Sequence, residues 1–78
     1  MIKTKIANYH EVSLRHDPTL PEDKEVIAIL KNGEDILVES NTVFFDWLGE
    51  RYYKAETLSG LKGYVVVKGT ELGGLLNG

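Results

Sequence analysis

The sequence contains no cysteine, only two prolines and one methionine among its 78 residues. Without cysteine, neither disulfide bonds nor a thiolate metal site can support the core. Long apolar runs are also missing, because the longest, Val26 to Leu30, is far too short to span a bilayer. No signal peptide is visible at the N-terminus. As supplied, the chain is expected to be cytoplasmic, whereas a domain excised from a larger protein would belong to the cell wall or the extracellular space.

Positive charge is not in excess. Nine lysine and arginine residues stand against twelve acidic ones, which gives a formal net charge of −3, and the lysines are dispersed along the chain. Nucleic-acid-binding proteins normally present a concentrated basic face, so we expect no nucleic-acid partner, and with no spanning segment we expect no membrane partner. A chain of this size buries about 60% of its unfolded surface, which predicts one domain with a thin core.

Residues that could carry chemistry are few. His10 and His16 each lie next to a carboxylate, but a spacing of six residues on a strand and loop does not bring imidazoles together on a metal. The serines lack a nucleophile-elbow context. Asp46 and Glu50 could act as paired carboxylates, yet acids in an exposed connection are usually only solvated. We therefore predict no enzyme, no metal site and no cofactor.

Alternation of apolar and polar residues predicts short strands. Residues 2–6 alternate isoleucine or threonine with lysine, and residues 12–14 repeat the pattern. Residues 16–25 hold both prolines and several acids without an apolar period, which predicts a loop. In the second half, RYYKA (51–55) and GLKGYVV (60–66) are separated by a turn that contains Ser59 and Gly60. This pattern predicts a β-hairpin.

The segment from Val26 to Leu30 is ambiguous. Pro21 and the acids after it resemble a helix start, and Asn32-Gly33 could cap the end of such a helix. With that helix, Gly73-Gly74 would suit a ubiquitin-like protein. However, the segment is rich in β-branched residues and has the length of a strand. We favour strand–turn–strand, with Val26 to Leu30 paired to residues 36–38 across Asn32-Gly33.

Four stretches, taken in order, resemble the bacterial SH3-like domain (SH3b). They are VSLRHDP (12–18), EVIAILKNGE (25–34), YYKA (52–55) and GLKGYV (60–65). Asp17 replaces the family's glycine, and Tyr52 and Tyr64 replace tryptophans. Val66 stands where the groove proline of eukaryotic SH3 domains would be, which argues against recognition of polyproline ligands. The resemblance implies a five- or six-stranded barrel and a binding role, in this family often toward cell-wall peptides or protein partners.

Strand pattern and resemblance together predict an all-β fold. We expect a small, SH3-like, partly open β-barrel of five to six short antiparallel strands over residues 1–72. Residues 73–78 are rich in glycine and are expected to form a flexible tail. Residues 41–50 are expected to connect two strands, although they carry an unusual number of aromatic residues.

The aromatic residues are the best candidates for a binding surface, because a thin core cannot hold them all. They are Tyr9, Phe44, Phe45, Trp47, Tyr52, Tyr53 and Tyr64. Strand alternation sends Tyr52 and Tyr53 to opposite faces, so one is expected outside. Trp47 lies between two acids in a connection, where it can project as an anchor. The alternative is that Trp47 and one phenylalanine only cover one end of the barrel.

We predict a partner-binding surface made of Trp47, Tyr52 and Tyr64, with Glu22 and Asp23 supplying charge that suits a basic or amine-bearing partner. The expected function is a non-catalytic module that recognises a protein or peptide. One alternative is a module that targets peptidoglycan peptides of the cell wall. The other is a small structural or regulatory subunit of a phage or mobile element, whose aromatic connection is buried in a homo-oligomer.

Overall fold

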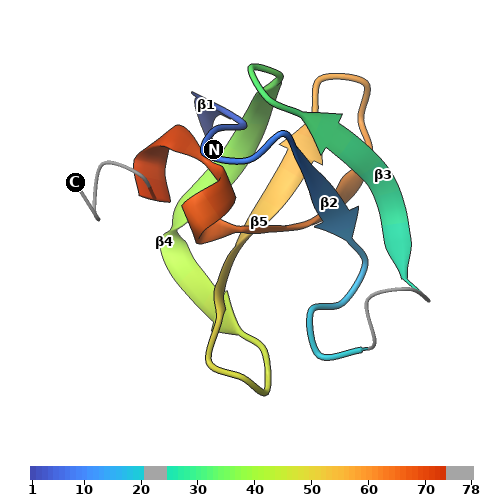
Figure 1. The fold of residues 1–78 in the computed structure, drawn as a ribbon, viewed down its shortest axis with the longest axis vertical. Coiled ribbons are helices and arrows are strands. Elements are labelled where there is room, and N and C mark those ends of the chain that lie inside the picture. The colour runs from blue at the N-terminus through green and yellow to red at the C-terminus, as the bar shows by residue number, and fades with distance from the viewer. Residues whose placement is uncertain (21–24, 74–78) are drawn as a thin grey trace.

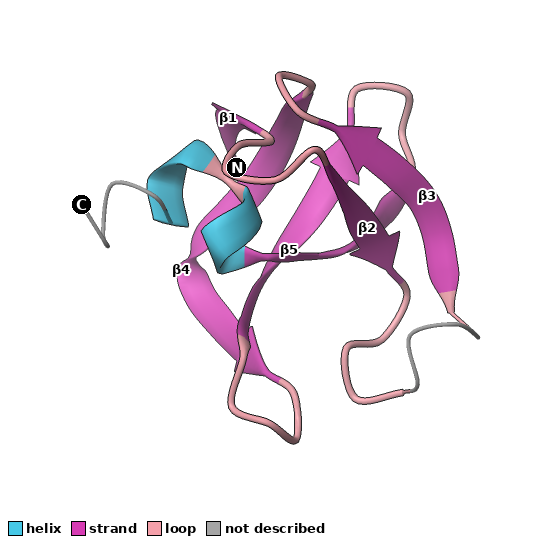
Figure 2. Cartoon of the chain, viewed as in Figure 1, coloured by secondary structure: helices cyan, strands magenta, loops and turns pink. Residues whose placement is uncertain are grey.

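The computed structural model describes residues 1–20 and 25–73. Most of them belong to six strands (Figure 1). The elements are β1 (Ile2–Lys5), β2 (Glu11–Arg15), β3 (Val26–Lys31), β4 (Asp35–Phe45), β5 (Arg51–Thr57), β6 (Lys62–Val66) and the short 3-10 helix η2 (Val67–Gly69). Residues 71–73 form a further helical turn (Figure 2). Most of the predicted tail lies outside the described residues.

The six strands form one antiparallel sheet in the order β1-β4-β5-β6-β2-β3. The sheet curls on itself, as Figure 1 shows, and β1 and β3 are the two ends of the strand order, so the barrel stays partly open. An isolated bridge between Ile6 and Thr70 brings the chain after η2 back beside β1. The small all-β, SH3-like fold predicted from the sequence is confirmed.

Strand β3 confirms one prediction and contradicts another. Val26–Lys31 is extended, so the helix and the ubiquitin-like alternative that depends on it are wrong. Its partner is β2, however, and not residues 36–38, which pair with β1 and β5. The Asn32-Gly33 turn is a corner between two parts of the sheet. Gly33 takes a φ of 87° there and donates its N–H to the carbonyl of Ile6 at 2.8 Å.

Strand β4 is longer than predicted. Residues 41–45, which we expected to lie in a connection, continue the strand, and the connection to β5 covers only residues 46–50. The pairing register shifts between Glu39 and Val43, where the polar run ESNT interrupts the alternation. An irregularity of this kind bends a strand without ending it. The sequence pattern at 39–42 therefore looks like a loop, although the backbone remains extended.

The core lies between the curled faces of the sheet and is aliphatic apart from one tyrosine. It consists of Ile6, Val12, Leu14, Leu30, Ile36, Val38, Tyr53, Ala55, Val65 and Val67. Each large aliphatic side chain buried in this way stabilises the fold by about 1.5–3 kcal/mol. Thr70 is also fully buried and donates its hydroxyl to the carbonyl of Val67 at 2.9 Å, which fixes the end of η2 against the core.

Gly63 marks the place where β6 crosses the end of β2. A Cβ atom at this position would lie 2.5 Å from the carbonyl oxygen of Arg15 and 3.1 Å from the side chains of Leu14 and Ile27. Only glycine allows this approach without moving the backbone. The close crossing therefore places the end of β2, and with it Arg15, directly beside β6.

We expect Gly63→Ala to lower the free energy of unfolding by about 1–3 kcal/mol, because the new methyl group must displace backbone atoms of β2. Urea denaturation followed by tryptophan fluorescence measures the change. The neighbouring exposed Lys62→Ala is the control and should stay within about 0.5 kcal/mol of the wild type. A Gly63→Ala protein as stable as the wild type would contradict the tight crossing.

Candidate functional site

A hollow of about 580 Å³ lies between residues 16–20 and the β4–β5 connection at 46–50. Strand β5 and η2 complete its walls. The apolar side chains that line it are Pro18, Leu20, Trp47, Leu48, Tyr52 and Val66. Four charged residues also reach it, and their contacts determine what the hollow can bind.

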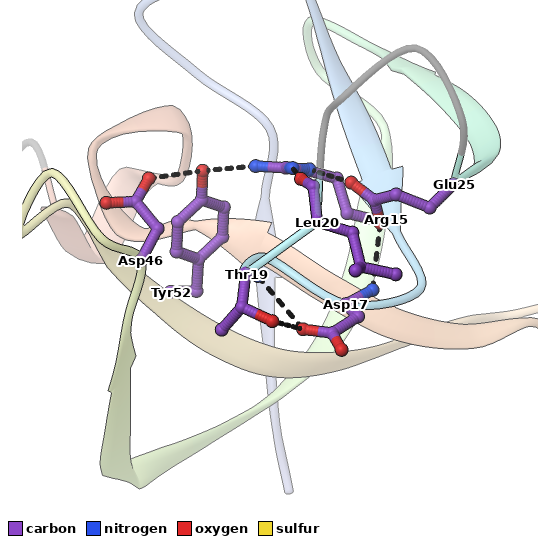
Figure 3. A network of polar contacts seen from close by, with 7 residues as sticks. All are labelled: Arg15, Asp17, Thr19, Leu20, Glu25, Asp46 and Tyr52. Atoms are coloured by element: carbon purple, nitrogen blue, oxygen red, sulfur yellow. Dashed lines mark hydrogen bonds and ion pairs between the residues drawn. The ribbon is translucent and has the colours of Figure 1, made fainter.

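An ion pair between Arg15 and Glu25 is buried at the base of the connection between β2 and β3 (Figure 3). Residues 16–20 of this connection are called the first loop. Nε of Arg15 donates to Oε1 of Glu25 at 2.5 Å, and the two side chains are only 9% and 3% exposed. The other carboxylate oxygen of Glu25 accepts the backbone N–H of Asp17 at 2.8 Å. Burying two charges is unfavourable unless they are paired and hydrogen-bonded, and both conditions hold here.

The remaining nitrogens of Arg15 hold two other segments. Nη1 donates to the hydroxyl of Tyr52 at 2.8 Å, and Nη2 donates to the carbonyl of Leu20 at 2.6 Å. The guanidinium also lies 5.5 Å from the centre of the Tyr52 ring, a cation–π geometry. Burial opposes the charge of Arg15, but the hydrogen bonds to Glu25 and Tyr52 outweigh it and raise the pKa of Arg15. The group is a permanent cation that joins the loop to β5.

The first loop is also fixed by its own contacts. Oδ1 of Asp17 accepts the backbone N–H and the hydroxyl of Thr19 at 2.9 and 2.7 Å, and Leu20 donates its N–H to the carbonyl of Asp17 at 3.1 Å. These bonds to Thr19 lower the pKa of Asp17. They form a compact turn that presents Pro18 and Leu20 to the hollow.

Asp46 fixes the backbone of the β4–β5 connection, residues 46–50, which is called the second loop. Its Oδ1 accepts the N–H groups of Leu48 and Glu50, both at 2.9 Å, and its Oδ2 accepts the hydroxyl of Tyr52 at 3.3 Å. Gly49, with a φ of 84°, closes the turn by donating its N–H to the carbonyl of Asp46 at 3.0 Å. Burial would raise the pKa of Asp46, but the two backbone N–H groups prevail and lower it. Residues 46–50 are therefore held in one conformation.

A second ion pair connects this loop to η2. Nζ of Lys68 lies 2.7 Å from Oε1 of Glu50, and the two side chains are partly exposed. The contact with Glu50 raises the pKa of Lys68. Pairs of this exposure contribute little to stability. The pair neutralises two of the charged groups that line the hollow.

Trp47 lies where the sequence predicted. It projects from the second loop and is 79% exposed, and its neighbour Leu48 is 73% exposed. The prediction for Tyr52 was wrong. We expected either Tyr52 or Tyr53 to be available outside, but both are buried, at 6% and 4% exposure. Tyr53 packs in the core, whereas Tyr52 points to the outer face and is covered by Arg15 and Asp46 (Figure 3).

Tyr64 is separated from Trp47. It is half-buried, stacks edge-on against Phe44 with ring centres 5.2 Å apart, and lines a smaller hollow of about 260 Å³ together with Phe45. Pro18 lies between the two hollows and lines both. The predicted surface is thus divided into two parts. Glu22 and Asp23, the predicted charged residues, lie outside the described residues.

Our sequence analysis did not single out Arg15 and Glu25. Both residues occur at the ends of strand patterns that flank the long loop, Arg15 as the last residue of β2 and Glu25 just before β3. Pairing these two strands as a hairpin would have placed the two side chains together. Because we paired residues 26–30 with residues 36–38 instead, the contact between Arg15 and Glu25 was not predicted.

Within residues 1–20 and 25–73, no three histidine or acidic side chains gather as metal ligands would. No helix among the described residues has the length and apolar character needed to cross a membrane. No family model, curated protein sequence or solved structure matches the chain. The geometry of the hollow is therefore the basis for assigning a function.

Removing Arg15 alone should destabilise the protein strongly. Arg15→Met leaves the carboxylate of Glu25 buried without its cation, and we expect a loss of about 3–5 kcal/mol in the free energy of unfolding. The double variant Arg15→Met/Glu25→Leu removes both charges and should recover most of that loss. Chemical denaturation of the two variants measures both values. Equal stability of the single and double variants would show that the two charges are not coupled.

Asp46 should make the protein sensitive to acid. Its folded pKa is lowered from the ordinary value of 3.8, so its contribution is present above about pH 4 and is lost as the pH falls through the folded pKa. In Asp46→Asn, the free energy of unfolding should fall less steeply with acid than in the wild type. Denaturation curves at a series of pH values test this, with the exposed Glu39→Gln as control. Parallel pH profiles for wild type and Asp46→Asn would contradict it.

Proposed function

We propose that this domain is a non-catalytic module that binds a protein or peptide partner in the hollow between residues 16–20 and 46–50. The observation that carries the proposal is the display of Trp47 and Leu48, which are exposed at 79% and 73% on a loop whose backbone is held by Asp46. Neighbouring exposed apolar side chains beside a hollow are typical of protein interaction sites, whereas single exposed apolar residues are common. Tryptophan is also the residue most enriched among binding hot spots.

The rigidity of the loop supports the proposal. An interface formed by mobile side chains or loops loses conformational entropy when a partner binds, which reduces affinity. Here the turn at Gly49, the carboxylate of Asp46 and the Tyr52–Arg15 contact fix the loop before any partner arrives. An anchor held in this way can bind with little reorganisation.

The shape of the surface supports an extended ligand. A second hollow, of about 400 Å³, adjoins the first and shares Val66 and Lys68 with it. Tyr9 and Ile29 line its far end and are 42% and 48% exposed. The combined surface runs from the second loop across η2 to β3. A peptide in extended conformation fits such a shape better than a compact small molecule does.

The arrangement of elements supports membership of the SH3-like domains. A long loop between β2 and β3, a curled meander of β4, β5 and β6, and a short 3-10 helix at its end surround the hollow. The bacterial SH3b family, whose motifs the sequence resembles, is the member of this group that we propose. A peptide of the cell wall and a segment of a protein are both partners of the expected kind.

The double variant Trp47→Ala/Leu48→Ala should abolish partner capture without loss of stability, since both side chains are mostly exposed. Leu58→Ala is the matched control, because Leu58 is 64% exposed on the turn between β5 and β6. Immobilised wild type and both variants are compared in pull-downs from lysate and in sedimentation with purified cell walls. We expect a partner that the wild type and Leu58→Ala retain and that the double variant loses.

A partner retained equally by all three proteins would contradict the assignment of this surface. Light scattering on the same samples identifies self-association. A wild type that forms oligomers and a double variant that is monomeric would mean that Trp47 and Leu48 contact a second copy of the chain and not a separate partner.

A further inference from the structure

Among the described residues that line the hollow, the charged groups are already matched by contacts within the protein. Arg15 is paired with Glu25, and Lys68 is paired with Glu50 at 2.7 Å. Each pair has no net charge. A ligand carrying a cation or an anion would have to compete with an existing ion pair, and for Arg15 the competing contact is buried.

Asp46 is the fourth charged residue that the described structure places at the hollow, and its oxygens are also engaged. They accept two backbone N–H groups and the hydroxyl of Tyr52. A ligand cation that drew this carboxylate away would break the turn that presents Trp47 and Leu48. The acid therefore serves the conformation of the loop, and recognition is left to the side chains that the loop exposes.

Exposed apolar side chains line the hollow beside these paired charges. Leu20 is 45% exposed, and together with Trp47 and Leu48 it forms two facing walls on the two loops. Pro18 and Val66 extend these walls. Burying apolar surface stabilises a complex by about 25 cal/mol per Å², and this contribution does not depend on the charge of the ligand.

We propose that the hollow selects an uncharged, apolar peptide segment, so that ligand charge contributes little to affinity. This inference rests on the proposed function and specifies its partner. It differs from the basic or amine-bearing partner expected from Glu22 and Asp23, which lie outside the described residues, because the acids described at the hollow hold the protein's own groups. The ligand is recognised by insertion of apolar side chains between Leu20 and the Trp47–Leu48 pair.

The test uses the folded chain and a phage-displayed library of random peptides. The library is selected on immobilised wild type after depletion on Trp47→Ala/Leu48→Ala, and Leu58→Ala serves as the control surface. Enriched peptides are synthesised, and their affinity is measured by fluorescence anisotropy between about 50 and about 500 mM NaCl, a range over which exposed charges become screened. We expect aromatic and aliphatic residues without an excess of lysine or arginine, and an affinity that changes by less than about twofold.

Peptides rich in lysine and arginine whose affinity falls by about tenfold over this range of salt would overturn the inference, while their dependence on Trp47 and Leu48 would still support the proposed function. A library that yields no peptide specific for the wild type over the double variant would overturn the proposed function itself. The two failures are therefore distinguishable.

Discussion

The buried ion pair between Arg15 and Glu25 is the interaction on which the rest of the site depends. It joins the end of β2 to the residue before β3, so it closes the base of the long loop. Arginine and glutamate side chains are almost never fully buried without a partner. Replacing such a pair by apolar residues is often neutral or stabilising, so its presence is better explained by the geometry that it imposes than by stability.

That geometry extends in one continuous line of contacts across the hollow. Arg15 holds Leu20 on one side and the hydroxyl of Tyr52 on the other, and Tyr52 in turn holds Asp46. Asp46 fixes the turn on which Trp47 is displayed. Among the described residues, every buried side-chain nitrogen and oxygen has a hydrogen-bond partner. Complete satisfaction of this kind makes a buried polar network rigid and specific.

The sequence was sufficient for the fold class and for the exposure of Trp47, but not for the site. Alternation predicted the strands at residues 2–6 and 12–14, β-branched residues and strand length predicted β3, and the turn at Ser59 and Gly60 predicted the β5–β6 hairpin. Strand partners were harder to predict, since the turn at Gly33 looks the same whether it joins paired strands or turns a corner. The burial of Tyr52 could not be read from alternation, which assigns a face but does not show that Arg15 covers that face. The network links residues 15, 25, 46 and 52, and none of these separations follows a local pattern.

The identity of residue 52 follows from the network. The indole N–H of a tryptophan at this position could donate a hydrogen bond but could not accept one. Tyr52 must do both, because its hydroxyl accepts from Nη1 of Arg15 and donates to Oδ2 of Asp46. Burial raises the pKa of Tyr52, which keeps the phenol protonated and able to donate. Tyr52 is thus a buried connector between Arg15 and Asp46, and Trp47 is the aromatic side chain exposed on the loop that Asp46 holds.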